Sequence, residues 1–399
     1  MEAPFIIYLK LWKRHHLEVR AMNNSKKNIL FMIPTLECGG AEKALVSLVN
    51  NLDFNKYSIT VQTIINTGLY ISELDKRINY KSIIKMKNKL FSLVFSYLIH
   101  FVIPPKLIYG FFVEKDNDIE VVFLQGLAVK IISASTNKKA KKYTWVQSDM
   151  MDNYLQLKIF KTVQNNAECY RKFDKIFCCS SGTRDSFIKR FGIEDNVYIQ
   201  QNVIDDEIIK KASEEACDYD YGNNFKMITV GRLVEQKGYD RLIKVCAELK
   251  SEGFVFKLLI IGEGYERERL WDLIEKNELE QYVNLHGFDA NPYKFMKKSD
   301  LFVCSSRVEG LSSVVIEALI LSLPVITTNC TGMSDLLGDS EYGLIVDNDE
   351  ESLYEGLKRF LTNKELLKHY KNKSSERSQY FKKGLRIKEI EAIFDEKEI

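Results

Sequence analysis

The chain alternates between apolar, strand-like runs and helical stretches from end to end. This alternation constrains the fold most, because parallel strands need long crossover connections and these are usually helices. Strands are expected at 28–33, 57–64, 119–124, 143–147, 174–180 and 197–200, and again at 226–230, 257–261, 282–285, 300–304, 324–328 and 343–346. The predicted fold class is α/β, with parallel sheets that carry helices on both faces.

The 399 residues are enough for two α/β domains, each with its own core. The stretch from Asn202 to Asn224 is acidic and poor in apolar residues, which is typical of a hinge. The sequence therefore predicts two Rossmann-like domains facing each other across a cleft, at 27–205 and 206–373. Residues 374–399 are charged and helix-prone.

Residues 1–26 are expected to be an N-terminal extension outside the fold. They hold a short apolar run followed by Lys13-Arg14-His15-His16, without the small-residue cleavage pattern of a signal peptide. Met22 begins a stretch that looks like a natural start of the first domain. We expect either that Met22 is the initiator or that the preceding residues form a loosely attached basic tail.

Composition excludes some classes of protein. A formal charge of +2 is far from the strong basic excess of most nucleic-acid binders, so no nucleic-acid partner is predicted. The eight cysteines form no C-x-x-C pair and have no histidine at ligand spacing. We expect them to behave as small apolar residues in a reducing cytoplasm, with no structural zinc.

The stretch from Arg307 to Leu323 is the first that indicates chemistry. An apolar strand, Leu301 to Cys304, leads through a polar turn to Ser312-Ser313, either of which can cap the helix that follows. A helix N-terminus of this kind favours an anion such as a phosphate. Glu309 and Glu317 flank it and suit the hydroxyl groups of a sugar, so the pattern suggests a nucleotide-sugar site. The alternative is an ordinary loop beside a solvated Glu317.

A second group of residues follows the predicted strand Lys226–Val230. Gly231 allows a ligand to approach the end of this strand, and Arg232 and Lys237 are spaced to reach one diphosphate. Lys237-Gly238 then opens a helix. The alternative is a solvated surface pair. Both groups lie at strand-to-helix turns, where ligands bind in open parallel sheets.

With these motifs in place, the chain resembles glycosyltransferase family 4. The resemblance rests on Gly231-Arg232 with Lys237-Gly238, and on Glu309 and Glu317 with seven residues between them. It covers roughly residues 27–370 and includes Gly39-Gly40-Ala41-Glu42, which is common among bacterial members that build surface polysaccharides. The resemblance implies a retaining, metal-independent transferase of the GT-B fold. Its N-terminal domain would bind the acceptor, its C-terminal domain the nucleotide-sugar, and the last helix would cross back to the N-terminal domain.

The resemblance also implies roles for individual residues. Arg232 and Lys237 would neutralise the diphosphate, and Glu309 would lie near the donor sugar and its anomeric carbon; these three are the predicted catalytic residues. Glu317 would hold the ribose, and Gly287-Phe288 would frame the nucleobase. The full set of predicted donor-binding residues is Gly39, Gly40, Gly231, Gly262, Gly287, Phe288, Gly310, Leu311, Ser312, Ser313 and Glu317. No metal and no cofactor are expected, since two cations and a helix end supply the positive field.

The acceptor side departs from the family pattern. Many relatives carry a histidine just after the strand that corresponds to residues 143–147, whereas Gln147 and Asp149 stand there in this chain, and no histidine occurs between His100 and His286. Gln147 and Asp149 are the candidate acceptor residues; Asp149 is equally suited to cap a helix. In front-face attack the leaving phosphate takes the acceptor proton, and a double displacement with Glu309 as nucleophile is the competing mechanism.

Residues 76–113 hold seven lysines or arginines and no acid. Within this range, an apolar run extends from Leu90 to Val102. The run is too short to span a bilayer but suits an anionic interface; the alternative is an ordinary core helix with a solvated flank. Many family members act on polyprenyl-diphosphate-linked sugars at the membrane. We therefore expect a cytoplasmic protein, peripheral at the inner face of the cell membrane.

Together these features predict transfer of a hexose or N-acetylhexosamine from a nucleoside-diphosphate sugar, with UDP preferred, to a lipid-linked or growing surface polysaccharide. Two alternatives stay open: a catalytically degenerate partner subunit, and a GT-B sugar-nucleotide enzyme such as an epimerase or phosphorylase. A nicotinamide dehydrogenase is disfavoured, because Gly39-Gly40 lacks the third spaced glycine of a dinucleotide fingerprint.

Overall fold

The computed structural model describes residues 26–37, 39–85, 97–151, 159–217, 219, 222 and 224–396. The chain forms two compact units, one from Met1–Trp145 and Leu155–Ile176 and the other from Val146–Tyr154 and Phe177–Ile399. The predicted N-terminal extension lies outside the described residues except for Lys26.

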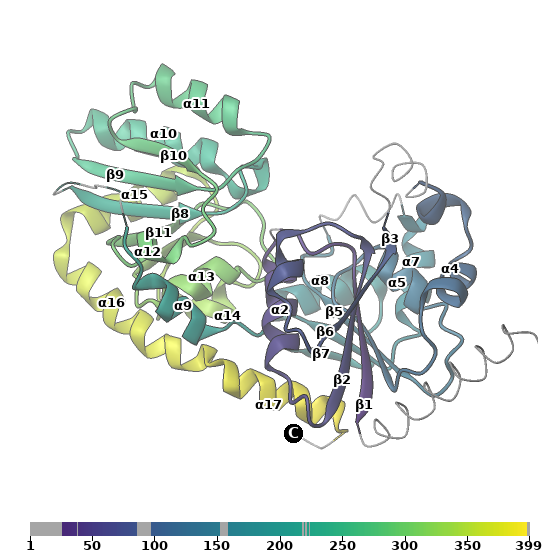
Figure 1. The fold of residues 1–399 in the computed structure, drawn as a ribbon. Coiled ribbons are helices and arrows are strands. Elements are labelled where there is room, and N and C mark those ends of the chain that lie inside the picture. The colour runs from purple at the N-terminus through teal and green to yellow at the C-terminus, as the bar shows by residue number, and fades with distance from the viewer. Residues whose placement is uncertain are drawn as a thin grey trace, which may run out of the picture. The chain divides into compact units, whose positions relative to one another are not determined.

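The first sheet has seven strands in the order β3-β2-β1-β4-β5-β6-β7 (Figure 1). β1 pairs in parallel with both β2 and β4, which places it inside the sheet. The strands are β1 (Lys27–Ile33), β2 (Tyr57–Ile65), β3 (Asn79–Ile84), β4 (Ile119–Val122), β5 (Lys141–Val146), β6 (Lys175–Cys178) and β7 (Val197–Ile199). The helices between them are α2 (Gly40–Asn51), η1 (Leu69–Glu73), η2 (Leu98–Val102), α4 (Pro105–Phe112), α5 (Leu127–Ile132), α7 (Val163–Tyr170) and α8 (Ser181–Phe191).

The second sheet has six strands in the order β10-β9-β8-β11-β12-β13. Its strands are β8 (Phe225–Val230), β9 (Phe256–Ile261), β10 (Val283–Gly287), β11 (Leu301–Cys304), β12 (Val325–Thr328) and β13 (Leu344–Val346). The helices of this part are α9 (Asp206–Ser213), η3 (Glu235–Lys237), α10 (Tyr239–Ser251), α11 (Arg267–Lys276), α12 (Tyr293–Met296), α13 (Ser313–Ile320), α14 (Met333–Leu337) and α15 (Glu350–Thr362).

Helices cover both faces of the second sheet because its strands are apolar on both sides. Successive side chains of a strand point to opposite faces, and Met227 and Ile228 accordingly join different cores. The Met227 core packs against α10 and α15, and the Ile228 core against α9, α12 and α13. Figure 1 shows these two helical layers on either side of the strands. The parallel, doubly covered sheets predicted from the alternation are therefore confirmed.

The chain ends in three consecutive helical segments, α16 (Lys364–Ser378), η4 (Gln379–Phe381) and α17 (Lys383–Phe394). The ammonium of Lys383, at the start of α17, lies 3.0 Å from each carboxylate oxygen of Asp205. Further along α17, Glu389 accepts a hydrogen bond of 3.3 Å from Gln200, just after β7. The last helix thus contacts the segment that follows the first sheet.

All twelve predicted strands are present, with ends that differ by a few residues. The prediction missed β3, which lies at the edge of the first sheet beside β2. Its sequence, NYKSII, is half polar, and its polar side chains are largely engaged by neighbours: Tyr80 contacts Thr63 and Asn66, and Lys81 pairs with Glu114. Three of its residues, Tyr80, Lys81 and Ser82, therefore broke the apolar pattern on which the strand prediction relied.

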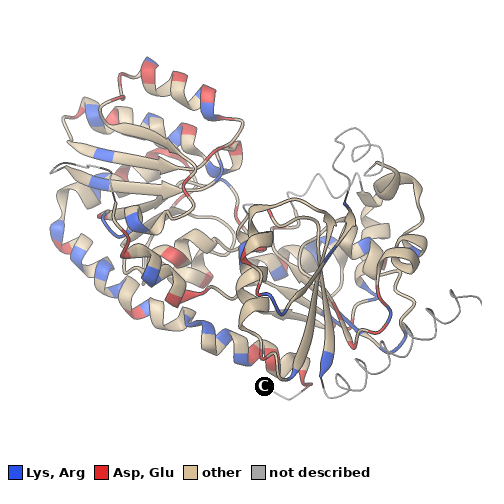
Figure 2. Ribbon diagram, in the orientation of Figure 1, with Lys and Arg blue, Asp and Glu red and all other residues tan. Residues whose placement is uncertain are grey.

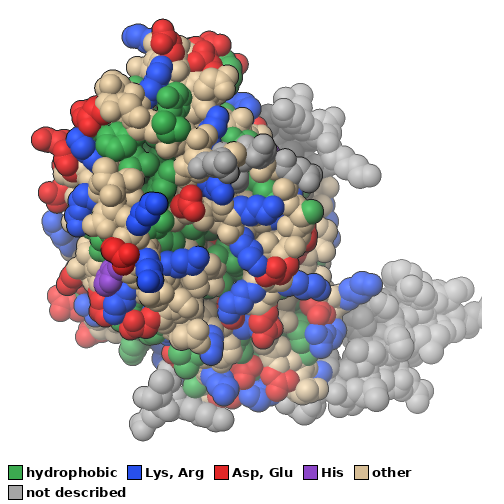
Figure 3. All heavy atoms as spheres, turned by 90° about the vertical axis from the view of Figure 1, so that its left-hand side faces the viewer, with side chains coloured by type: hydrophobic (Ala, Val, Ile, Leu, Met, Phe, Trp, Pro, Cys, Tyr) green, Lys and Arg blue, Asp and Glu red, His purple; other side chains and the backbone are tan. Residues whose placement is uncertain are grey.

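Charged residues lie mainly on the helices and loops and sparsely on the strands (Figure 2). On the face drawn in Figure 3, basic and acidic side chains are interspersed with small apolar areas. Among the described residues, no helix combines the length and the apolar character needed to cross a bilayer.

One charged residue of the first sheet is fully buried and sets a pH dependence. The Tyr109 hydroxyl donates to Glu120 Oε1 over 2.5 Å, and Glu120 has no exposed surface. Burial raises the pKa of Glu120 above its ordinary 4.5, against the lowering effect of the Tyr109 hydrogen bond. Above pH 4.5 the folded protein thus holds a proton that the unfolded chain has released, so stability falls as pH rises through this window.

We expect Glu120→Gln to gain stability over the wild type as pH rises above 4.5, by at most about 1.4 kcal/mol per pH unit. Urea unfolding at several pH values, followed by tryptophan fluorescence, measures this, since Trp145 is buried against Phe123. Glu194→Gln is the control: Glu194 is exposed, so the difference should not change with pH. A constant difference for Glu120→Gln would contradict the assignment.

Candidate active site

The second sheet changes direction between β8 and β11. From β8 the chain continues to β9 on one side, and from β11 it continues to β12 on the other. The connecting helices α10 and α13 cover opposite faces, so the loops that lead to them diverge and leave room at the carboxyl ends of the strands. The two sequence motifs occupy these two loops.

In the loop after β8, two glycines are required by close contacts. A Cβ on Gly231 would lie 2.8 Å from the Tyr239 hydroxyl and 3.4 Å from Lys237 Cε. Gly231 therefore leaves the space that the lysine side chain occupies over the strand end. Gly238 has a left-handed φ of 65°, and a Cβ there would lie 2.1 Å from the Ser305 carbonyl oxygen.

The loop after β11 is bound to the loop after β8 along its length. The Ser305 hydroxyl donates to the Lys237 carbonyl over 2.9 Å. The Arg307 amide donates to the Gln236 carbonyl over 2.8 Å, and the Gln236 side chain donates to the Val308 carbonyl over 2.7 Å. The two loops therefore form one structural unit.

A bidentate ion pair closes this unit on its outer side. Arg307 donates through its two terminal nitrogens to the two carboxylate oxygens of Asp240, over 2.8 and 2.9 Å. Burial works to raise the pKa of Asp240, but the hydrogen bonds and charge of Arg307 outweigh it and hold that pKa below its usual value. Asp240 is therefore a carboxylate at neutral pH.

The central contact of the site joins Lys237 to Glu309. The lysine Nζ lies 2.6 Å from Glu309 Oε1, and the Ser306 hydroxyl donates to the same oxygen over 2.6 Å. The side chains are only 19% and 9% exposed. Burial disfavours the charged lysine, but the adjacent Glu309 carboxylate outweighs this and raises the pKa of Lys237. Lys237 is therefore an ammonium at neutral pH.

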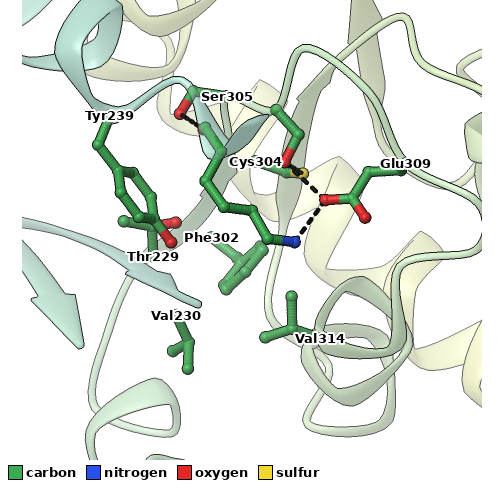
Figure 4. Close-up of a pocket in the computed structure, with 10 residues that line it drawn as sticks. Thr229, Val230, Tyr239, Phe302, Cys304, Ser305, Glu309 and Val314 are labelled. Carbon is green, nitrogen blue, oxygen red and sulfur yellow. Dashed lines mark hydrogen bonds and ion pairs between the residues drawn. The ribbon is translucent and has the colours of Figure 1, made fainter. Parts of the chain in front are cut away.

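A small pocket surrounds this ion pair. Figure 4 shows Glu309 entering from one side, with two dashed lines meeting at one carboxylate oxygen, and Tyr239 and Thr229 on the other side. Phe302, Val314 and Val230 provide apolar walls. The pocket holds about 190 Å³ of space, part of it open to solvent. It therefore combines one cation, one carboxylate and an apolar floor.

The start of α13 differs from the prediction in one respect. Ser312 occupies the N-cap position, but its hydroxyl makes no capping bond, so the expected side-chain cap is wrong. That hydroxyl is buried and has no hydrogen-bond partner among the described residues. The amides of the first turn have no partner within the helix either. Donors are thus gathered where a phosphate was predicted.

The remaining donor-site candidates fall into two groups. Glu317 is 5% exposed and accepts a hydrogen bond of 3.1 Å from Tyr293, so the solvated alternative is wrong. Glu317 does not line the pocket around Lys237. Arg232 is exposed, and its guanidinium forms no ion pair with any other residue that the structure describes.

The glycines at the ends of β8, β9 and β10 lie side by side. The Gly262 amide donates to the Gly287 carbonyl over 2.8 Å, and a Cβ on Gly262 would lie 1.9 Å from the Gly231 carbonyl oxygen. Phe288, next to them, is 53% exposed. Gly39 and Gly40 stand in the other unit, at the start of α2, where the first sheet changes direction between β1 and β4.

The acceptor candidates are held by hydrogen bonds within the second compact unit. The side-chain amides of Gln147 and Asn202 donate to each other over 3.1 and 2.8 Å. Asp149 accepts from the Met151 amide over 2.8 Å and from the Thr331 hydroxyl over 2.7 Å. Their role toward an acceptor stays a prediction.

Metal binding was not predicted. Within the part of the chain that the structure describes, no three histidine, cysteine or acidic side chains gather to hold an ion. Whether the reaction needs a metal is a separate question, and metal independence stays a prediction.

The sequence prediction did not include Ser306, Asp240 and Arg241, which hold the residues of the site in place. Arg241 shares the buried face of α10 with Leu242, Val245 and Leu249. A cation inside an apolar helix stripe was the signal for it, because such a side chain needs acceptors in the interior.

Comparisons with known proteins concern the family and the fold. Residues 220–377 match the family model of glycosyl transferases group 1. Among solved structures, Anabaena HepE in complex with UDP and glucose has a TM-score of 0.75 and 17% identity, over 93% of this chain and 100% of that chain. Sucrose-phosphate synthase from Thermosynechococcus elongatus has a TM-score of 0.74 and 15% identity, over 93% and 99%. These likenesses confirm the predicted GT-B fold of two Rossmann-like domains.

Curated relatives include glycosyltransferases of bacterial glycan synthesis. The chain is 40% identical over 218 residues to a Campylobacter jejuni N-acetylgalactosamine-N,N'-diacetylbacillosaminyl-diphospho-undecaprenol 4-alpha-N-acetylgalactosaminyltransferase, covering 54% of this chain and 58% of that protein. It is 35% identical over 147 residues to the Staphylococcus aureus capsular polysaccharide biosynthesis glycosyltransferase CapM, covering 36% and 38%. The chain thus spans somewhat over half of the first of these relatives. The resemblance to glycosyltransferases is confirmed, and assignment to family 4 stays a prediction.

The buried pair predicts a measurable coupling. Lys237→Met leaves the Glu309 carboxylate buried without its cation, so we expect the protein to fold but to lose roughly 2–3 kcal/mol of stability. Glu309→Gln in the same chain should restore part of this loss, with a coupling of at least about 1 kcal/mol in a double-mutant cycle measured by urea unfolding. The control cycle uses Lys244 and Glu350, whose side chains are 52% and 46% exposed, and should give under about 1 kcal/mol. Additive effects at Lys237 and Glu309 would refute the pair.

Proposed function

We propose that the protein is a retaining, metal-independent glycosyltransferase. It moves a hexose or N-acetylhexosamine from a UDP-sugar to a lipid-linked or growing surface polysaccharide. The observation that carries this proposal is the Lys237–Glu309 pair beside the start of α13, whose buried Ser312 hydroxyl has no partner among the described residues. A charged ammonium, an orphan hydroxyl and first-turn amides are donors for a diphosphate, and Glu309 is an acceptor for sugar hydroxyls.

Lys237 can bind the diphosphate without releasing Glu309. An ammonium has three N–H groups, and Glu309 accepts one of them. Arg232 adds an exposed guanidinium at the end of the same strand. In the transfer, the bond between the anomeric carbon and the diphosphate oxygen breaks and the acceptor oxygen bonds to that carbon. The acceptor proton passes to the leaving diphosphate, whose charge Lys237 and Arg232 stabilise.

The pocket favours front-face attack over a double displacement. A double displacement requires a nucleophilic carboxylate and a second acid–base group near it. Of the ten residues that line the pocket, Glu309 alone carries a carboxyl group. Its Oε1 is engaged by Lys237 and Ser306, which lowers its strength as a nucleophile. Glu309 instead orients the sugar and stabilises positive charge at the anomeric carbon.

The acceptor class rests on the relatives. The Campylobacter relative is named for a diphospho-undecaprenol-linked substrate, and CapM for capsular polysaccharide. We propose an acceptor of the same chemical class, a glycan on a polyprenyl diphosphate, with Gln147 and Asp149 on the acceptor side. Gly39 and Gly40 would approach the donor phosphates from the other domain, Gly287 and Phe288 would frame the base, and Glu317 would hold the ribose.

Calorimetric titration without added metal tests the donor site. We expect UDP to bind with micromolar affinity and GDP, ADP and NAD to bind at least tenfold more weakly. Lys237→Ala should weaken UDP binding at least tenfold, because the diphosphate loses its central cation. Lys244→Ala, a solvated lysine of α10, is the matched control and should bind as the wild type does.

Release of UDP from UDP-sugars tests catalysis in the same preparations. Glu309→Ala should keep most of its UDP affinity and lose at least about 100-fold in turnover. Wild-type-like turnover in Glu309→Ala would overturn the site assignment. If the wild type binds UDP but releases none, the degenerate-subunit alternative replaces this proposal.

We also propose that the protein docks on the inner face of the cell membrane through residues 76–113. Several apolar side chains in its described part are exposed; Phe111 reaches 80% and Phe101 52%. The exposed set is Tyr97, Phe101, Val102, Leu107, Phe111 and Phe112. α4 turns Leu107 and Phe111 outward while it buries Ile108 and Tyr109. Lys81 pairs with Glu114, just beyond the segment, and the predicted Lys87 and Lys89 lie outside the described residues.

Vesicle co-sedimentation tests the docking. On vesicles of phosphatidylglycerol and phosphatidylcholine, we expect Lys81, Lys85, Lys87 and Lys89 changed to Glu to release the protein, at about 1 kcal/mol for each lost charge. Phe111→Ser should weaken binding on neutral and anionic vesicles alike. Charge reversal of the exposed Lys364, Lys368, Lys371 and Lys382 is the control. Unchanged sedimentation of both test variants would reject the docking.

A further inference from the structure

Arg241 is a buried cation that the proposed mechanism does not use. It projects from α10 and is 4% exposed. Its Nε and Nη2 donate to the Ser305 carbonyl over 2.9 and 2.7 Å, and Nη2 also donates to the Ser306 carbonyl over 2.7 Å. Longer contacts of 3.2 Å reach the Asn348 carbonyl and the Thr328 hydroxyl. One guanidinium therefore binds the segments that follow β11 and β13 and the last residue of β12.

None of these acceptors is a carboxylate. The neighbouring Asp240 is engaged by Arg307 through both of its oxygens. A buried guanidinium without a carboxylate acceptor is costly to keep charged. In line with this, burial, and then the charge of Arg307, lower the pKa of Arg241. An apolar side chain would fill the same interior without this cost. The value of the guanidinium to the protein therefore lies in the groups it orients rather than in stability.

The two serines that Arg241 binds are also hydrogen-bonded to Lys237 and Glu309, the active-site pair. The Ser306 carbonyl, fixed by Arg241, also accepts from the Thr328 hydroxyl over 2.6 Å, and the Ser306 hydroxyl donates to Glu309 Oε1 over 2.6 Å. Ser305, the other residue that Arg241 holds, donates to the Lys237 carbonyl. One residue thus links Arg241 to each member of the pair: Ser305 links it to Lys237, and Ser306 links it to Glu309.

We propose that Arg241 is a positioning residue that holds Ser305 and Ser306 so that Glu309 and Lys237 meet in the geometry used for transfer. The kinetic effect expected from this inference rests on the proposed function, whereas the geometric effect rests on the structure alone. In this proposal Arg241 takes no part in donor binding by the loop after β11. It controls the orientation of the Glu309 carboxylate through Ser306.

The kinetic test compares Arg241→Met, Arg241→Lys, Ser306→Ala and the double variant Arg241→Met/Ser306→Ala. UDP release is measured from UDP-glucose, UDP-galactose and their two N-acetylated forms, and UDP affinity by calorimetry. We expect kcat to fall about 10–100-fold in Arg241→Met while the UDP dissociation constant changes less than about threefold. Arg241→Lys keeps the charge but not the fork, so it should recover only part of kcat.

The double variant tests the route. If Arg241 acts through Ser306, Arg241→Met/Ser306→Ala should be no slower than the worse single variant by more than about twofold. Lys244→Met, a solvated lysine of the same helix, should keep wild-type kcat. Wild-type kcat in Arg241→Met, or kcat and UDP affinity falling by the same factor, would overturn the proposal. If the Arg241 variants do not fold, Ser306→Ala decides: it must lose kcat with UDP binding preserved.

A crystal structure of ligand-free Arg241→Met separates this inference from the proposed function. We expect the 2.6 Å contact between Lys237 Nζ and Glu309 Oε1 to be lost or clearly lengthened. An unchanged contact would overturn the positioning role, whatever the activity. A wild type without UDP binding or release would instead overturn the proposed function, and the variant structure would still test the positioning.

Discussion

The site depends on the pairing of β8 with β11. These strands are neighbours in the second sheet, although Lys237 and Glu309, which follow them, are 72 residues apart in the chain. Parallel pairing brings both carboxyl ends to one edge, and the placement of α10 and α13 on opposite faces of the sheet leaves a space there. The backbones then approach so closely at Gly238 and Ser305 that no Cβ fits. Every hydrogen bond between the two loops follows from this placement.

The charges around the two loops do not balance. Four basic residues, Arg232, Lys237, Arg241 and Arg307, lie in or beside the two loops, against three acidic residues, Glu235, Asp240 and Glu309. The difference is one positive charge, in addition to the positive end of α13. Because an uncompensated charge is costly in a partly buried place, an anionic ligand relieves the imbalance. The proposed diphosphate site is thus a property of the folded loops as a group rather than of one lysine.

Sequence reasoning recovered much of this and missed the rest for identifiable reasons. The buried strands were predictable because apolar runs as short as those of β8 and β11 suit a buried strand and are too brief for a helix. β3 was not, since polar residues such as Lys81, which pairs with Glu114, interrupt its apolar pattern. Lys237 and Glu309 were found because charged residues at strand ends are conspicuous. The direct contact between Lys237 and Glu309 could not be predicted, because it depends on which strands are neighbours in the sheet. Ser306 could not be predicted either, because it contributes only a hydroxyl that donates to a residue three positions further along the chain.

The short pairing between β8 and β11 also affects how the site forms during folding. The two strands share a register of only Met227 with Leu301 and Ile228 with Phe302, whereas β8 and β9 pair along six residues. Strands β8 to β10 and β11 to β13 are therefore two half-sheets, each encoded by a continuous stretch of chain. Neither half contains a complete site, since the lysine belongs to one and the glutamate to the other. The proposed catalytic pair can form only when the two halves dock, so a nascent chain still lacking β11 presents an ammonium without its carboxylate.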